Sequence, residues 1–248
     1  VASFKIKSLP ADGTLYSDSG LSSAISVNAT ISASSNAANV YFVPSADWNG
    51  TTTFDYTSID SNSVESSEAQ ATITVTAAND LPTSTADSIS VVEDTNYTLS
   101  ESDFGAYSDT DGDALTKVQI TVLPSTGTLQ LYDGSSSWDN VSADAEITVA
   151  QLANGYLRYV PAANGNGPDY ATISFKVHDG TGYSANAYNL DITVAPINDA
   201  PLAASVTASG AEDAASITIA LSGSDTEDSS VASFKIKSLP ADGTLYSD

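Results

Sequence analysis

Eighteen residues, VASFKIKSLPADGTLYSD, run from Val1 to Asp18 and recur unchanged from Val231 to Asp248. Eighteen consecutive identities do not arise by chance between unrelated segments. The two copies begin 230 residues apart, at Val1 and Val231, which is far longer than the units of about 20 to 50 residues that build solenoids. We therefore expect the chain to be one period of a longer array, with whole domains in each period.

Short runs of alternating apolar and polar residues recur along the chain, as in ATITVT (Ala71 to Thr76), ATISFKV (Ala171 to Val177) and NLDITV (Asn189 to Val194). This period of two predicts half-buried strands, and clusters of Gly, Pro, Asn and Asp between the runs predict turns. Sustained helical periodicity is absent, although VAQLANG (Val149 to Gly155) is long enough for one helical turn. The predicted fold class is all-β, with Ig-like or cadherin-like Greek-key β-sandwich domains in tandem.

Two similar linkers, TAANDLP (Thr76 to Pro82) and APINDAP (Ala195 to Pro201), each follow an alternating run and end in proline. They bracket a segment of the right size for one β-sandwich, which predicts a complete domain over residues 81–200, here called domain B. Residues 1–80 and 201–248 are then the C-terminal part of one domain A and the N-terminal part of the next copy of domain A.

The landmarks of the split domain follow the same order as those of domain B. GAED (Gly210 to Asp213) corresponds to VVED (Val91 to Asp94), and SDTED (Ser224 to Asp228) corresponds to SDTDGD (Ser108 to Asp113). Further along, LPADGTLY, VYFVPSADWNG and FDYTSID correspond to LPSTGTLQLY, LRYVPAANGNG and ISFKVHD. The expectation is that the sequence is an excerpt cut inside domain A, so that both of its ends carry the same stretch of that domain.

The chain has 31 Asp and Glu against 7 Lys and Arg, a formal net charge of −24. Such a surface repels nucleic acid and anionic membranes, so neither is an expected partner, and no apolar run is long enough for direct membrane insertion. Because cysteine is absent, disulfides, thiolate metal sites and cysteine nucleophiles are excluded. Acidity of this kind also covers the solvated surface of many secreted proteins, and only clustering of the acids favours a metal.

Strand direction sorts the acids of domain B into two groups. If the first strand (about residues 86–91) descends from the upper linker, Glu93 and Asp94 lie at the bottom. A return strand near residues 97–100 then places the following acidic loop at the top. The last strand, about residues 183–194, must descend to the lower linker, so its partner ascends and Asp179 lies at the top.

Two junction clusters follow from this sorting. The upper one is predicted to contain Asn79, Asp80, Asp109, Asp111, Asp113 and Asp179. The lower one is predicted to contain Glu93, Asp94, Asn198 and Asp199, with Asp225, Glu227 and Asp228 from the top loop of the next domain. In domain A, Asp60 is the counterpart of Asp179, and Glu212 and Asp213 are the counterparts of Glu93 and Asp94.

Carboxylates at close range repel one another unless a cation neutralises them, and Ca²⁺ takes about six to eight oxygen ligands in flexible geometry. Ca²⁺ is therefore the predicted cofactor, since Zn²⁺ prefers His and Cys and Mg²⁺ demands a tighter octahedron. The acidic loop is not an EF-hand, because Ala114 occupies the required glycine position and Ile120 the twelfth. An Asp/Gly turn, and an Asx turn stiffened by proline in each linker, are simpler readings that remain open and are compatible with a metal.

The order of these motifs across nearly the whole chain resembles the cadherin-like, Ig-like repeats in the extender region of giant repeats-in-toxin (RTX) adhesins of Gram-negative bacteria. The stretches that carry the resemblance are VVEDTNYTLSESDFGAYSDTDGDALTKVQITVLPSTGTL, YLRYVPAANGNGPDYATISFKVHDG and INDAP. The resemblance implies an extracellular, Ca²⁺-stiffened extender on a bacterial cell surface, with a role in adhesion and biofilms. Its neighbours would be other repeats of the same chain.

Enzymatic activity is not expected. His178 is the single histidine, no G-x-S-x-G elbow is present, and domain A has Ile59 where domain B has His178. Adjacent carboxylates such as Glu93 and Asp94 point apart on a strand, which does not suit a glycosidase.

The alternative function is a carbohydrate-binding Ig-like adhesion module that uses exposed aromatic rings as stacking platforms. The candidate rings are Trp48, Trp138, Tyr132 and Tyr107. An exact repeat fits a structural spacer better than a single receptor site, so the extender is the preferred interpretation. The division of domain A further predicts that one chain's tail can complete the next chain's head, which would give head-to-tail self-association.

Overall fold

The structure is a computed structural model that describes residues 1–228 and 230–247. Ser229 and Asp248, the last residue of the predicted segment 201–248, lie outside the described residues. The chain forms two compact units. Unit 1 contains Val1–Pro82 with the loops Ser108–Ala114 and Asp179–Gly182, and unit 2 contains Thr83–Tyr107, Leu115–His178 and the chain from Tyr183 onward.

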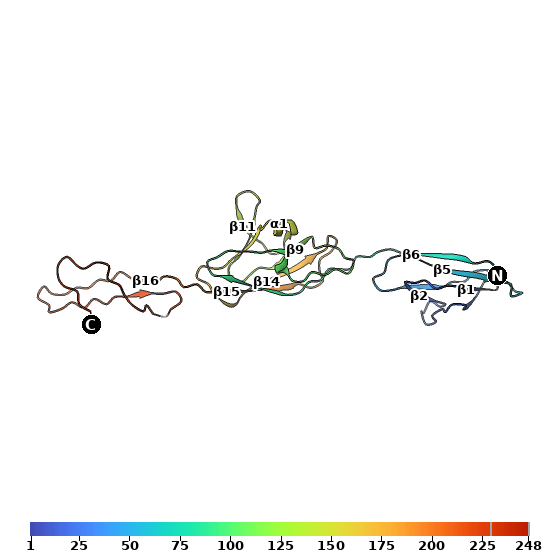
Figure 1. Ribbon diagram of the computed structural model, residues 1–248, viewed down its shortest axis with the longest axis horizontal. Helices are drawn as coiled ribbons and strands as arrows, with labels where there is room; N and C mark the ends of the chain where they lie inside the picture. Colours follow the sequence, from blue (N-terminus) through green and yellow to red (C-terminus); the bar gives the residue numbers. More distant parts are fainter. Residues whose placement is uncertain (229, 248) are drawn as a thin grey trace. The chain divides into compact units, whose positions relative to one another are not determined.

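Unit 2 contains a sandwich of two sheets, whose strands β9, β14 and β15 are labelled in Figure 1. The five-stranded sheet has the order β12 (Ala145–Thr148), β9 (Lys117–Val122), β14 (Gly167–His178), β15 (Tyr188–Ala195) and β7 (Asp87–Val92). The four-stranded sheet has the order β11 (Trp138–Asn140), β10 (Thr128–Tyr132), β13 (Leu157–Val160) and β8 (Tyr97–Thr98).

The alternation in the sequence explains how this sandwich is filled. In β15 every second residue, Leu190, Ile192 and Val194, is buried, while the residues between them face solvent. The rings of Phe104 and Phe175 meet edge to face with their centroids 5.0 Å apart in the same core. The all-β, Ig-like sandwich predicted from the sequence is confirmed.

Strand β7 runs parallel to β15, with Asp87 opposite Leu190 and Val92 opposite Ala195, and β14 runs antiparallel to β15. Because the first and last strands of the sandwich are parallel, the chain enters it at one end and leaves it at the other. The end of β14 at His178 lies at the entry end, and the end of β7 lies at the exit end.

Two short helices and one strand boundary refine the sequence prediction. The expected helical turn forms as α1 (Val149–Ala153), where Thr148 and Gln151 make a capping box. The 3₁₀ helix η1 (Glu101–Phe104) was not predicted. The last strand was predicted from Tyr183, but β15 begins at Tyr188. Tyr183 forms only an isolated antiparallel bridge with His178, and a bend at residues 185–186 interrupts the ladder before Tyr188.

Unit 1 repeats part of this arrangement with fewer strands. One sheet has the order β3 (Thr30–Ser32), β1 (Ser3–Ile6), β5 (Gly50–Ile59) and β6 (Ala69–Val75), and β2 (Gly13–Tyr16) pairs with β4 (Tyr41–Pro44) in the other. Its fully buried apolar core consists of Ile6, Leu15, Ile25 and Phe54.

The segment from residue 201 onward, here called the tail, has little regular structure. Its described residues form one antiparallel pair of two-residue strands, β16 (Leu202–Ala203) and β17 (Gly223–Ser224). Leu202, Leu239 and Tyr246 expose 71%, 74% and 87% of their surface. Over the described part of the chain, no helix has the length and apolar character needed to span a membrane.

Candidate metal centres

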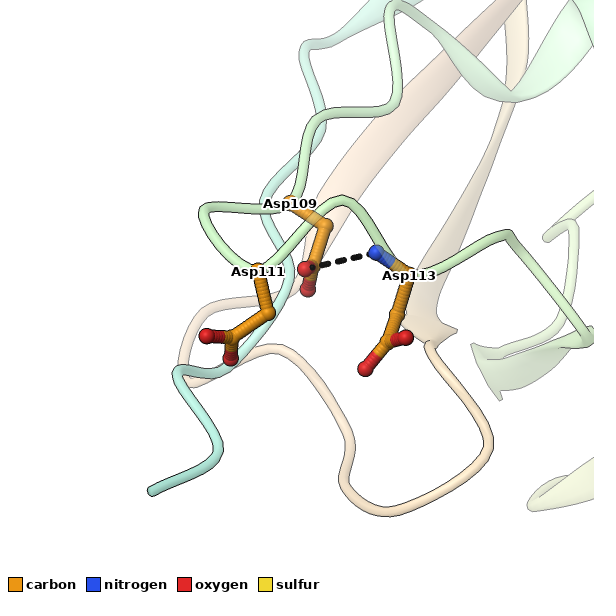
Figure 2. A group of neighbouring side chains, drawn as sticks. All are labelled: Asp109, Asp111 and Asp113. Atoms are coloured by element: carbon orange, nitrogen blue, oxygen red, sulfur yellow. Dashed lines mark hydrogen bonds between the residues drawn. The ribbon is translucent and has the colours of Figure 1, made fainter. Parts of the chain in front are cut away.

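Three carboxylates of the loop before β9 converge in unit 1 (Figure 2). One oxygen from each of Asp109, Asp111 and Asp113 lies within 4.8 Å of the others. Gly112 takes a φ of +83°, which allows the loop to turn tightly between them. The backbone N–H of Asp113 donates to Asp109 Oδ1 at 3.1 Å and fixes the curvature of the loop.

The second oxygen of Asp109, Oδ2, is buried in this loop. It accepts no hydrogen bond from the described residues. A buried carboxylate oxygen without a donor is costly, and a cation is one group that would compensate it.

The linker residues Asn79 and Asp80 are attached to two different loops. The N–H of Asp80 donates to Asp111 Oδ2 at 2.7 Å. The side-chain amide of Asn79 donates to Asp179 Oδ2 and to the Asp80 carbonyl, both at 3.0 Å. Asp179 is only 7% exposed, and its Oδ1 accepts the N–H groups of Thr181 at 2.5 Å and Gly182 at 2.7 Å. All residues predicted for the upper cluster therefore lie in one neighbourhood.

The pKa of the Asp80 carboxyl is raised above its ordinary value, first by desolvation and then by the negative charges of Asp47, Asp111 and Asp109. Sequence reasoning did not include Asp47 in the cluster. The structure shows that the carboxylate of Asp80 shares this region with three others, and desolvation and all three of these charges raise its pKa.

The lower linker repeats the upper one with different residues. The N–H of Asp199 donates to Glu227 Oε2 at 3.0 Å, and the Asn198 amide donates to the Asp199 carbonyl at 2.8 Å. Asp225 Oδ1 accepts the N–H groups of Glu227 at 3.2 Å and Asp228 at 2.9 Å. Glu227 thus occupies the place that Asp111 has in the upper cluster.

Glu93 is a buried clamp on the lower linker. Its side chain is 0% exposed, Oε1 accepts the Ile197 N–H at 2.6 Å, and Oε2 accepts the Asn166 side-chain amide at 2.8 Å. The backbone N–H of Glu93 also donates to the Ala195 carbonyl at 3.0 Å. A carboxylate has about four acceptor sites, so these two bonds leave capacity for a cation.

Asn164 connects the two remaining acids of the lower cluster. Its N–H donates to Asp94 Oδ1 at 2.9 Å. With its amide oriented to satisfy both neighbours, Asn164 Nδ2 donates to Asp94 Oδ2 at 3.2 Å and to Asp199 Oδ2 at 3.1 Å.

Asn164 and Asp47 hold matching places in the VPAANGNG and VPSADWNG turns, with φ values of 55° and 57°. The first of these turns brings Asp47 to the upper cluster, and the second brings Asn164 to the lower one. The sequence signal that could have revealed their role is the Asx residue that both aligned turns carry at the same position.

The remaining predicted residues lie apart from these clusters. Asp60 accepts the N–H groups of Asn62 at 2.9 Å and Val64 at 2.7 Å, as Asp179 does in its own loop. The register of β5 on β6 pairs Gly50 with Val75, so Asp60 lies at the end of unit 1 opposite Val75. Glu212 and Asp213 are exposed in the tail.

The chemistry of these clusters suits a hard divalent cation. The side-chain atoms that they offer to a metal ion are carboxylate and amide oxygens, and the chain has no cysteine to offer a softer ligand. Asp109 Oδ2 accepts no hydrogen bond from the described residues, and desolvation together with the charges of Asp47, Asp111 and Asp109 raises the pKa of Asp80, so negative charge gathers at this linker. The residues present therefore fit Ca²⁺.

Three of the candidates, Trp138, Tyr132 and His178, make ring contacts within unit 2. The Arg158 guanidinium lies 3.9 Å from the ring centroid of Trp138, which also packs on Tyr132 at 5.4 Å between ring centroids. The ring of His178 meets Tyr183 edge to face at 4.4 Å. One face of Trp138 is therefore already covered by a cation.

Two packed sheets with a parallel first and last strand, and acidic linkers at both ends, define an Ig-like β-sandwich repeat. Residues 79–193 match the family model of the bacterial Ig domain. The match supports a bacterial Ig-like repeat and suggests a repeat of the type found in surface adhesins. Bacterial Ig domains are typically extracellular surface modules without catalytic activity. No curated protein matches the chain.

Proposed function

We propose that the chain is an extender repeat of an RTX-type bacterial adhesin, in which Ca²⁺ bound at the linkers stiffens the array and projects distal adhesive domains. The observation that carries this proposal is the repetition of one arrangement at both linkers. In each, the N–H of the linker aspartate, Asp80 or Asp199, donates to an acid of a nearby SDT loop, Asp111 or Glu227. A recurring linker geometry is expected of a spacer, whereas a receptor site needs only one copy.

Ca²⁺ would be held by the carboxylates of Asp80, Asp109, Asp111 and Asp113 at the upper linker. It would supply positive charge that cancels their mutual repulsion, and its flexible coordination would accept oxygens from the linker and both loops. A short linker without an ion leaves neighbouring domains mobile, so binding would restrict their angle. At the lower linker, Asp94, Asp199 and Glu227 would serve the same purpose.

Small-angle X-ray scattering tests the mechanical part of the proposal. Saturating Ca²⁺ is expected to increase the maximum dimension of the chain over that in excess EDTA, while the circular dichroism spectrum stays the same. The variant Asp111→Ala should respond less than the control Asp133→Ala, because Asp133 binds the N–H groups of its own serine-rich turn. An equal maximum dimension with and without Ca²⁺ would argue against stiffening.

A further inference from the structure

The first and last strands of the sandwich in unit 2 form one parallel ladder. It runs in unbroken register from Asp87 opposite Leu190 to Val92 opposite Ala195. The chain enters β7 at Asp87 and leaves β15 at Ala195. The two points through which the rest of the chain can pull on this sandwich therefore lie at opposite ends of one ladder.

Tension along the chain loads this ladder in shear. A pull on Ala86 draws β7 toward the entry end, and a pull on Pro196 draws β15 toward the exit end, so the two strands are drawn in opposite directions along their own axes. The backbone bonds of a parallel ladder are evenly spaced, and in this geometry they share the load. If both points of attachment lay at one end of the ladder, the bonds would instead open one after another and each would carry the load alone.

The pairing of β7 with β15 is the place where such a load would act. β7 is the edge strand of the five-stranded sheet, and β15 is its only partner strand among the described residues, whereas β15 is also held by β14. Separation of β7 would uncover Ile89 and Val91, which are 8% and 3% exposed, so it would also cost apolar burial.

Glu93 extends the ladder beyond its last strand pair at the exit end. Its backbone N–H donates to the Ala195 carbonyl at 3.0 Å, and its Oε1 accepts the Ile197 N–H at 2.6 Å, past the end of β15. Its Oε2 accepts the Asn166 amide at 2.8 Å. A pull on the exit segment therefore reaches the bond between Glu93 and Ile197 before it reaches the strand pairs.

The bond between Glu93 and Ile197 has two properties that resist rupture. Its acceptor is a carboxylate, and hydrogen bonds to ionised groups are stronger than bonds between neutral groups. The Glu93 side chain is 0% exposed, so the local dielectric is low and water is kept from replacing the bond as it lengthens. This clamp therefore strengthens the end of the ladder that the exit segment loads first.

The entry end of the ladder has an attachment of its own. The Ser84 hydroxyl, in a side chain that is 8% exposed, donates to the Phe104 carbonyl at 2.7 Å. The N–H of Ala106 donates to Thr85 Oγ1 at 2.9 Å. The segment before β7 is thus fastened to the end of η1 and the residues after it, and both ends of the ladder are held by bonds outside the strand pairing.

We propose that the parallel pair β7 and β15 is the element that carries tension through this repeat, and that Glu93 is its clamp at the exit end. The source of the tension rests on the proposed function, since an extender is pulled whenever the domains that it projects are held. Ca²⁺ at the linkers would set the angle between neighbouring domains. The β7–β15 ladder has a different role, because it keeps the sandwich folded while the chain is pulled.

Single-molecule force spectroscopy on the whole chain tests the pulling geometry, with handles attached to two introduced cysteines, since the natural chain has none. Ala86→Cys with Ala200→Cys, both at exposed positions, loads the ladder in shear. Ala86→Cys with Ala187→Cys, also exposed, places both handles at the entry end and peels the strands apart. The unfolding force should be about twofold higher in shear, because the ladder bonds share the load.

Substitution of Glu93 tests the clamp. Glu93→Ala should raise the rate of forced unfolding in shear about tenfold, the equivalent of one lost charge-assisted hydrogen bond, and should change the rate of peeling much less. Glu93→Gln keeps the volume and an acceptor for the Ile197 N–H, so its effect should be smaller. Asp191→Ala is the matched control, because this exposed acid of β15 accepts the Thr172 hydroxyl of β14 at 2.8 Å, a bond that the load does not cross.

The measurements are made in millimolar Ca²⁺ and repeated in excess EDTA. A higher force in shear than in peeling in both buffers, with an effect of Glu93→Ala confined to shear, would support the proposal even if scattering showed no stiffening by Ca²⁺. Equal forces in the two geometries, or an equal effect of Glu93→Ala in both, would overturn it. So would a difference that appears only with Ca²⁺, since the resistance would then come from the metal sites rather than from the strands.

Discussion

Asp80 donates its backbone N–H to the Oδ2 of Asp111 at 2.7 Å, and this bond attaches the linker to the acidic loop that precedes β9. The bond uses one oxygen of Asp111 and leaves its carboxylate beside those of Asp109 and Asp113. Asp111 therefore links two roles of the loop. The loop positions the linker, and it also concentrates negative charge next to the linker. A cation that relieves the charge should also strengthen the attachment.

The first prediction is that Ca²⁺ stabilises the chain. A ligand that binds the folded state alone adds about 2.7 kcal/mol per site at about 100 times its dissociation constant. Thermal melts with millimolar Ca²⁺ should therefore lie above melts with excess EDTA. Asp111→Ala should reduce the difference at the upper linker, and Asp199→Ala should reduce it at the lower one.

Asp133→Ala is the control for these melts. Three consecutive serine N–H groups, of Ser135, Ser136 and Ser137, hold the pKa of Asp133 well below its ordinary value, so its charge is compensated locally. Asp133→Ala should therefore leave the Ca²⁺ response unchanged. Coincident melts of the unsubstituted chain in Ca²⁺ and in EDTA would end the metal hypothesis.

The second prediction concerns pH. Because the folded-state pKa of Asp80 is raised, the metal-free folded chain binds more protons than the unfolded chain between the ordinary and the raised value. The contribution of Asp80 to stability is therefore greatest below this window and is lost as pH rises through it. Protons also compete with the cation, so Ca²⁺ affinity should fall as pH decreases through the raised pKa.

Calorimetric titration of Ca²⁺ at a series of pH values measures this competition. Asp80→Asn removes the titrating group and should flatten the pH dependence at the upper linker while weakening binding. A pH dependence that Asp80→Asn leaves unaltered would assign the titration to another carboxylate.

The third prediction concerns the buried clamp Glu93. Glu93→Ala leaves the Ile197 N–H and the Asn166 amide without their acceptor and opens a cavity, which should cost about 2 to 4 kcal/mol of unfolding free energy. Glu93→Gln keeps the volume and one acceptor oxygen, so its cost should be smaller. Urea denaturation monitored by circular dichroism separates the two, and an equal loss would show that charge rather than hydrogen bonding holds the linker.

The strands of unit 2 were predictable because alternation and turn residues agree along the chain. In β15, the pattern of Leu190, Ile192 and Val194 alone identifies the buried face. The direction of each strand followed from counting reversals between two linkers, and this placed Asp179 and Glu93 at opposite ends. Counting strand reversals shows at which end of the sandwich a residue lies, but it does not show which residues its side chain contacts.

The contacts that were missed depend on three-dimensional closeness between distant turns. Asp47 approaches Asp80 through a turn that reads in the sequence as an ordinary proline turn with a following tryptophan. Asn164 reaches both Asp94 and Asp199 only because its backbone adopts a positive φ, a local choice that any Asx residue in a turn could make. The burial of Glu93 was also not evident, because a carboxylate near a strand end usually faces solvent.

The fourth prediction compares one strand position in two sandwiches. Ile192 of β15 is 0% exposed because β7 covers it, whereas Ile73 of β6 is only partly buried. Ile192→Ala should therefore cost about 2 to 5 kcal/mol of unfolding free energy, since it leaves a cavity in a closed core, and Ile73→Ala should cost less. Chemical denaturation of the two variants measures both costs, and an equal cost would contradict this difference in packing.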